Sequence, residues 1–95
     1  MARRRYLIAY DIANSGRLRR VIKVMEAHGQ RLQYSVFMCD LSAIELVRWR
    51  AELMPILKLD EDSVVTIDLG PRDRPSPMAV YGVPRALPKS GVTVV

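Results

Sequence analysis

One acid at the end of an apolar run is the residue of this chain best placed to do chemistry. Residues 6–12 are apolar apart from Asp11, and such a run is typical of a central strand that is buried on both faces. A carboxylate at the end of that strand is costly to desolvate unless it meets a cation, a metal ion or water. The bases that follow it are Arg17, Arg19, Arg20, Lys23 and Arg31.

One acid surrounded by bases at a strand end suggests a metal-assisted site that acts on phosphodiesters. A simpler interpretation is that Asp11 only orders the turn between this strand and the next helix, as aspartate often does. Arg17 and Arg20 lie near the start of that predicted helix, where positive charge opposes the helix dipole. Their placement makes sense if an anion binds there, and both interpretations of Asp11 stay open.

The charge of the chain is biased toward its amino-terminal third. Fifteen Lys and Arg stand against ten Asp and Glu, which gives a net charge of +5 and a pI near 9.9. Seven of the fifteen bases precede residue 24, where Asp11 is the only acid, whereas acids gather at 60–62. This distribution favours a nucleic acid or another polyanion as a partner, although ordinary solvated charges would give the same count.

Several classes of protein are excluded by composition. Cys39 is the only cysteine, so an intrachain disulfide and a cysteine metal cluster are ruled out, and we expect it to be a small buried hydrophobe. The apolar run after the arginines at 3–5 is broken by Asp11 and is too short for a secretory signal. No segment has the length needed to cross a bilayer. We therefore expect a cytoplasmic protein with no membrane partner.

The order of the predicted elements indicates the fold. A helix with an apolar stripe is predicted between the capping residues 14–16 and Gly29. Residues 31–41 read as two strands with a break near 34–35, or as one bent strand. Ser42 and Glu45 form a capping box, and the helix that they begin should kink or end near Pro55. The stripe predicted for this second helix is Leu46, Trp49, Leu53 and Ile56, widened by Val47, Ala51 and Met54.

A further strand at 63–69 completes a ferredoxin-like α+β sandwich of the order βαββαβ, with both helices on one face of the sheet. The other face needs a cover, and a two-fold homodimer is the simplest one. After Gly70 the chain is rich in proline and holds two short strand-like pieces, 78–83 and 92–95. We therefore divide it into a ferredoxin-like domain, 1–78, and an extension, 79–95, with an extra strand that packs on the partner subunit.

These residues closely resemble the CRISPR-associated protein 2 family, small proteins of the machinery that acquires CRISPR spacers. The resemblance covers about residues 5–70 and is most specific where Tyr10-Asp11-Ile12 is followed at this distance by Gln33-Tyr34-Ser35-Val36-Phe37. Because the spacing of the arginines varies among relatives, the family pattern carries over to Arg20 more safely than to Arg17. The other matching residues are Arg19, Gly29, Arg31, Leu32, Cys39, Leu41, 62–63 and 69–70.

The resemblance implies a homodimer whose carboxyl-terminal strand crosses to the partner. It also implies a metal-dependent endonuclease centred on Asp11, which acts on single-stranded RNA or on double-stranded DNA. Members of the family also form the central scaffold between dimers of the integrase, CRISPR-associated protein 1.

Physical chemistry is consistent with that expectation. Mg²⁺ is often held by one or two carboxylates together with water and substrate phosphate, so two copies of Asp11 at a two-fold axis could share one ion. Arg20 and Arg31 would hold phosphate oxygens in this catalytic site through their planar donors. Tyr10 and Phe37 either support the catalytic site or stack on a base, or they are plain core residues. Arg17, Arg19 and Lys23 complete the predicted phosphate contacts.

Three classes of function remain open from the sequence. The first is a Mg²⁺-dependent nuclease that uses Asp11. The second is a non-catalytic scaffold in which the basic face holds duplex DNA and Asp11 is dispensable. The third is an RNA-binding or ligand-sensing ferredoxin-like module outside this family, and the chain lacks the aromatic-rich motif expected of an RNA-binding module.

Overall fold

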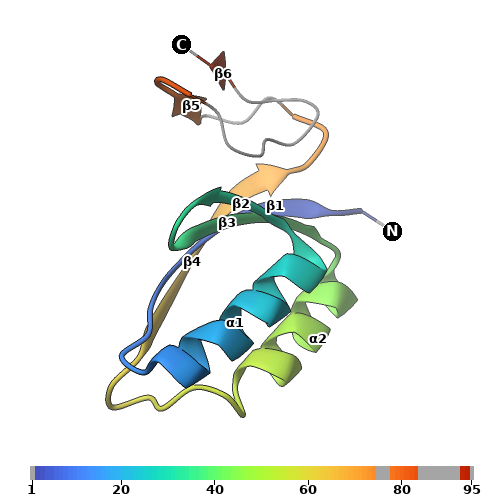
Figure 1. Ribbon diagram of the computed structural model, residues 1–95. Helices are drawn as coiled ribbons and strands as arrows, with labels where there is room; N and C mark the ends of the chain where they lie inside the picture. The colour runs from blue at the N-terminus through green and yellow to red at the C-terminus, as the bar shows by residue number, and fades with distance from the viewer. Residues whose placement is uncertain (1, 75–77, 84–92, 95) are drawn as a thin grey trace.

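The computed structural model describes residues 2–74, 78–83 and 93–94. Two helices and four strands build the main body, and two further strands of two residues each follow (Figure 1). The elements are β1 (Arg4–Asp11), α1 (Ser15–His28), β2 (Gln30–Gln33), β3 (Val36–Leu41), α2 (Ala43–Leu53), β4 (Ser63–Pro71), β5 (Ala79–Val80) and β6 (Thr93–Val94).

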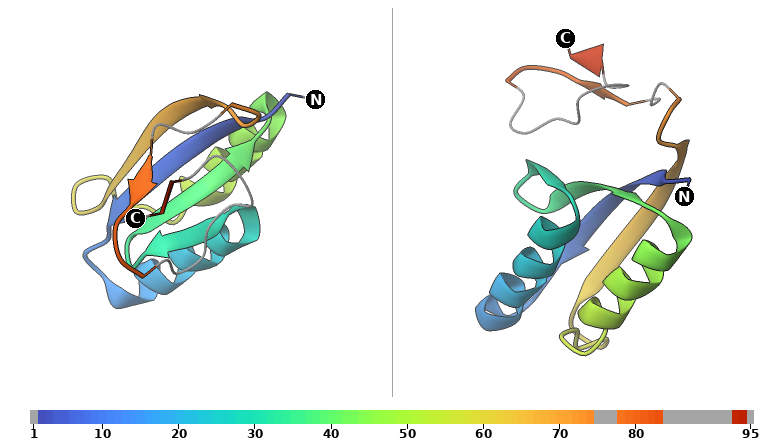
Figure 2. Two further views of the ribbon diagram at one scale, coloured as in Figure 1. Left: turned by 90° about the horizontal axis from the view of Figure 1, so that it is seen from above. Right: turned by 90° about the vertical axis from the view of Figure 1, so that its right-hand side faces the viewer.

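The main sheet has the strand order β2-β3-β1-β4, and each neighbouring pair is antiparallel. Both helices cover the same face of this sheet, while β5 and β6 lie on the opposite side (Figures 1 and 2). This arrangement confirms the ferredoxin-like α+β fold. The strand β1 is central, so its carboxyl end, with Asp11, lies between the ends of two neighbouring strands.

The core lies between the sheet and the helices. Ile8 and Tyr10 of β1 point into it because side chains alternate along a strand, and Phe37 of β3 packs beside them. On the other face, Val65 and Ile67 of β4 are 52% and 48% exposed. Leu7 and Ala9 of β1 pair with them on this face and are only partly buried, so the prediction that the central strand is buried on both faces is not met within one chain.

The hairpin alternative for residues 31–41 is confirmed, because β2 ends at Gln33 and β3 begins at Val36. Gly29 ends α1 as predicted, but not through a left-handed backbone, since its φ of −160° is extended. A Cβ at Gly29 would collide with Cys39 Sγ and with the carbonyl oxygen of Met38. Glycine is needed there because the chain passes directly against β3.

The helix α2 begins with the predicted capping box, in which Ser42 and Glu45 each bond to the other's backbone. It ends at Leu53, just before Pro55, and Trp49 is buried as expected. The predicted widening of its apolar stripe is wrong. Only one side of the helix packs on the sheet and α1, and the residues on its free side are exposed; these are Val47, Ala51 and Met54.

Cys39 is buried, as its sequence context predicted, and burial raises the pKa of its thiol to about 12. Beyond β4, the strands β5 and β6 pair with each other in parallel. They lie inside the predicted pieces 78–83 and 92–95, of which residues 92 and 95 are outside the described residues. No helix in the described parts of the chain is long and apolar enough to cross a membrane.

Candidate functional site

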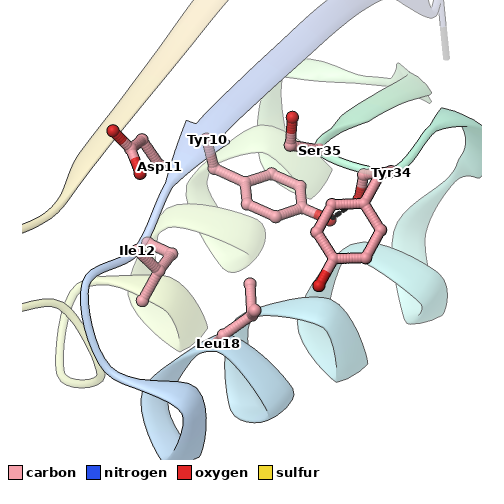
Figure 3. A pocket seen from close by; sticks show the side chains of 6 residues that line it. All are labelled: Tyr10, Asp11, Ile12, Leu18, Tyr34 and Ser35. Carbon is pink, nitrogen blue, oxygen red and sulfur yellow. Dashed lines mark hydrogen bonds between the residues drawn. The ribbon is translucent and has the colours of Figure 1, made fainter.

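Asp11 is the last residue of β1 and is exposed. Because side chains alternate along the strand, its carboxylate lies on the face of the sheet away from the helices, and Figure 3 shows it pointing away from the ring of Tyr10. Its register partner on β4 is Ser63. Among residues 2–74, 78–83 and 93–94, nothing forms a hydrogen bond or an ion pair with this carboxylate.

The turn after β1 is held by other residues than Asp11. The side chain of Asn14 caps α1 by accepting from the backbone N–H of Arg17 at 2.9 Å. The backbone N–H of Ala13 donates to Asp62 Oδ1 at 3.0 Å. The simpler interpretation, in which Asp11 orders this turn, therefore does not account for its side chain.

Asp62 is a buried acid whose importance sequence reasoning missed. Its carboxylate accepts from the backbone N–H groups of Ala13 and Lys58, and from Arg17 Nε at 2.8 Å. The hydrogen bond from Arg17 is the main reason that the pKa of Asp62 is held well below its usual range. The available signal was the run of acids at 60–62, directly before the strand that pairs with the end of β1.

Arg17 is paired with two acids, Asp62 and Glu61. Besides its bond to Asp62, its guanidinium donates to Glu61 Oε1 at 2.9 Å, and these hydrogen bonds raise the pKa of Arg17. A phosphate would have to compete with two carboxylates for the same donors. Glu61 and Asp62 thus lie against the start of α1, although the sequence suggested that acids and bases occupy separate regions.

The three arginines before the first apolar run are also paired. Arg3 bonds to Glu45 of α2, Arg4 to Asp68 of β4 and Arg5 to Asp40 of β3, at 2.8–2.9 Å. By contrast, the cations on the outer side of α1 are exposed and form no ion pair within the described part of the chain. They are Arg19, Arg20 and Lys23.

The remaining predicted site residues lie in and beside the core. Phe37 is fully buried, Tyr10 is almost so, and their ring centroids are 6.1 Å apart. The Tyr10 hydroxyl donates to the carbonyl oxygen of Tyr34 at 2.9 Å, and burial raises its pKa against the opposing charge of Arg31. The guanidinium of Arg31, which is half-buried, lies 5.4 Å from the centre of the Phe37 ring. Core packing therefore describes Tyr10 and Phe37, whereas Arg31 reaches the surface.

A cavity of about 300 Å³ opens beside the end of β1. It lies between this strand, α1 and the turn that joins β2 to β3 (Figure 3). Its walls combine apolar, aromatic and polar side chains. They come from Tyr10, Asp11, Ile12, Leu18, Tyr34 and Ser35.

The fit of these residues to a metal ion depends on the number of carboxylates. Among the described residues, no group of three or more His, Cys, Asp and Glu side chains could hold one. Asp11 supplies a single free carboxylate. Mg²⁺ accepts such a sparse protein contribution, because it keeps several waters and takes its other oxygens from substrate phosphate. Asp11 therefore fits Mg²⁺ as one ligand of a shared or substrate-completed site.

The family model of CRISPR associated protein Cas2 matches residues 4–75. A protein of Thermodesulfovibrio yellowstonii named CRISPR-associated endoribonuclease Cas2 2 is 42% identical over 89 residues, which cover 94% of this chain and 93% of that protein. A CRISPR-associated endoribonuclease Cas2 of Geobacter sulfurreducens is 40% identical over 72 residues, 76% of each chain.

The fold is similar to solved structures as well. The crystal structure of Streptococcus pyogenes Cas2 matches with a TM-score of 0.61 and 33% identity, covering 66% of this chain and 82% of the other. These matches agree with the family resemblance seen in the sequence. This chain belongs to the CRISPR associated protein Cas2 family.

Proposed function

We propose that this chain is a CRISPR-associated endonuclease that cleaves RNA or DNA phosphodiesters with the help of Mg²⁺, and that Asp11 is its metal ligand. The observation that carries the proposal is the exposed carboxylate of Asp11, which none of the described residues engages. An unneutralised acid at the end of a central strand is poised to hold a cation. The names of the two relatives, both endoribonucleases, support the same reaction.

Mg²⁺ would polarise the scissile phosphate and supply a hydroxide near neutral pH. The part of Asp11 is to fix the position of that ion at the end of β1. Arg20 and Arg31 would hold phosphate oxygens, and the exposed cations Arg19 and Lys23 would extend this contact along α1. Arg17 is left out of this set because Glu61 and Asp62 engage it.

A homodimer would complete the site. Asp11 lies on the same face of the sheet as Val65 and Ile67, whose apolar side chains are half exposed. Packing two copies through this face would cover those side chains and bring the two Asp11 carboxylates toward one axis. The extension from residue 79 onward would then pack on the partner subunit, as the sequence suggests.

The second candidate function is a non-catalytic scaffold that holds duplex DNA for the CRISPR integrase, CRISPR-associated protein 1. The observation that favours it is the contrast between three free cations on α1 and one free acid at the site. Phosphate contacts from α1 would hold DNA whether or not Asp11 binds a metal ion. The two functions are compatible in one protein.

Asp11→Asn tests the nuclease, with Asp60→Asn as its matched control. Both residues are exposed acids that none of the described residues engages, so the two variants lose the same charge. We expect Mg²⁺-dependent cleavage of labelled RNA and DNA to fall at least about 100-fold in Asp11→Asn and to stay at the wild-type rate in Asp60→Asn. Cleavage by highly purified Asp11→Asn at the wild-type rate would refute the site.

Spacer acquisition in cells separates the two functions. If cleavage matters, Asp11→Asn should stop acquisition while it still binds DNA. If scaffolding is sufficient, Asp11→Asn should acquire spacers normally and the double variant Arg19→Ala/Arg20→Ala should not.

A further inference from the structure

Tyr34 is an aromatic side chain that the fold holds in solvent. It lies in the two-residue turn between β2 and β3, and 72% of it is exposed. Its carbonyl oxygen accepts from the Tyr10 hydroxyl at 2.9 Å, and the next carbonyl, of Ser35, accepts from the backbone N–H of Tyr10 at 3.1 Å. Because the backbone of this turn is tied to the central strand at two points, the position of Tyr34 is fixed while its ring stays exposed.

The ring borders the cavity of about 300 Å³ beside β1. In Figure 3 the ring of Tyr34 lies at one end of this cavity and Asp11 at the other. Ile12 and Leu18 give it apolar walls, while Ser35 adds a hydroxyl group. A space with an aromatic face, apolar walls and a polar group suits a flat heterocycle that carries hydrogen-bonding groups at its edge.

The charges around this cavity suit the backbone of a nucleic acid. Of the exposed cations of α1, Arg19 and Arg20 follow Leu18 directly in the chain, and Lys23 lies about one helical turn beyond Arg19. The positive charge of Arg31, on β2, acts on the hydroxyl of the cavity residue Tyr10, and this hydroxyl donates to the carbonyl oxygen of Tyr34. A phosphate chain could therefore lie on the cations while one of its bases enters the cavity.

We propose that this cavity binds one unpaired nucleobase of a single-stranded nucleic acid, stacked on the ring of Tyr34. This inference rests on the proposed function and adds a preference for single strands to it. A base within a duplex is already stacked and paired, so it would have to be flipped out before it could enter. Tyr34 should therefore strengthen the binding of single strands and contribute little to duplex binding.

The test measures binding in EDTA, where cleavage cannot interfere. The probes are RNA and DNA oligonucleotides that carry one 2-aminopurine, a fluorescent base that is quenched when it stacks. We expect Tyr34→Ala to lose the quenching and to bind single strands about 5- to 150-fold more weakly. Tyr34→Phe, which keeps the ring, should restore both. Tyr81→Ala is the matched control, because Tyr81 is 78% exposed and lies outside the cavity.

The RNA and DNA probes show which strand the cavity accepts, and a loss with either one supports the proposal. Unchanged quenching and affinity for both strands in Tyr34→Ala would overturn it. An equal loss of affinity for a duplex would also overturn it, because the ring would then position the phosphates. Dissociation of a dimer by Tyr34→Ala in sedimentation would overturn it as well, because the ring would then serve contact between subunits. Because this test needs no cleavage, its result stands apart from that of Asp11→Asn.

Discussion

The basic residues of the amino-terminal third fall into two regions with different roles. Those on β1 and at the start of α1 are bound to acids from distant parts of the chain, as Arg5 is to Asp40 and Arg17 is to Asp62. Those on the outer side of α1, Arg19 and Arg20 among them, meet no acid in the described part of the chain. Net charge thus overstates the charge that is free to bind a partner, and among the bases before residue 24 the free ones lie on α1.

The largest effect is expected from the double variant Arg19→Ala/Arg20→Ala. A cation that contacts a DNA phosphate releases counterions from the DNA, and this release favours binding. Removing the cation therefore weakens the affinity. We expect the affinity for duplex DNA at 0.1 M salt to fall about 10- to 100-fold, measured by fluorescence anisotropy. Arg3→Ala/Arg4→Ala removes the same number of bases from the paired region and is the matched control. An equal loss in both variants would mean that only the total charge matters.

The second effect is on stability and is expected from Arg17→Ala. This variant leaves Asp62, whose side chain is buried, without its cation. We expect the Tm to fall by roughly 10 °C or more in thermal unfolding followed by circular dichroism, with little change in affinity for DNA. Arg20→Ala should show the reverse, a weaker affinity at the wild-type Tm. If the Arg17→Ala variant kept the wild-type Tm but bound DNA more weakly, Arg17 would contact phosphate as the free cations do.

Much of the fold could be predicted because local patterns report local structure. The capping box at Ser42 and the break at 34–35 needed only neighbouring residues to be read correctly. The partners of the arginines could not be read in this way, since Arg17 and Asp62 are 45 positions apart and meet only through the pairing of β1 with β4. The same limit explains the error in the apolar stripe of α2. The sequence shows that Val47 is apolar, but it does not show on which side of the helix the sheet lies.

The same limit applies to the candidate site: a residue marked by a local pattern could be predicted, and a residue defined by distant contacts could not. Asp11 was recognisable because one acid interrupts an apolar run, and the structure leaves its side chain exposed. Asp62 was not recognisable, because a buried acid in a run of acids has no local sign of its burial. Tyr34 was recognised as a turn residue and as part of the family motif, but not as a side chain exposed beside a cavity, because that depends on how the turn is bonded to Tyr10.

A smaller effect is expected from pH, and it also belongs to the paired region. The hydrogen bond from Arg3 is the main cause that lowers the pKa of Glu45 from its ordinary 4.5 to about 2. An acid whose pKa is lower in the folded state stabilises the fold above its unfolded pKa, and this stability is lost as the pH falls toward the folded pKa. The Tm should therefore fall between pH 4.5 and about 2. Glu45→Gln should flatten this dependence, and an unchanged pH profile would show that the pair does not contribute.

The smallest effect is expected from Arg3→Ala alone. Both side chains of the Arg3–Glu45 pair are substantially exposed, and such surface pairs contribute little because water screens them. We expect a Tm within about 3 °C of the wild type at neutral pH and an unchanged affinity for DNA. A larger loss of affinity would show that Arg3 leaves Glu45 to bind phosphate.

The division of the bases between the fold and the nucleic acid is tested most directly by the salt dependence of DNA binding. Log affinity is measured against log salt concentration for the wild type, Arg17→Ala and Arg20→Ala. Because each phosphate contact adds about 0.9 to the slope, Arg20→Ala should lower it by about 1 and Arg17→Ala should leave it unchanged. A slope lowered equally by both variants, or by Arg17→Ala alone, would contradict this division.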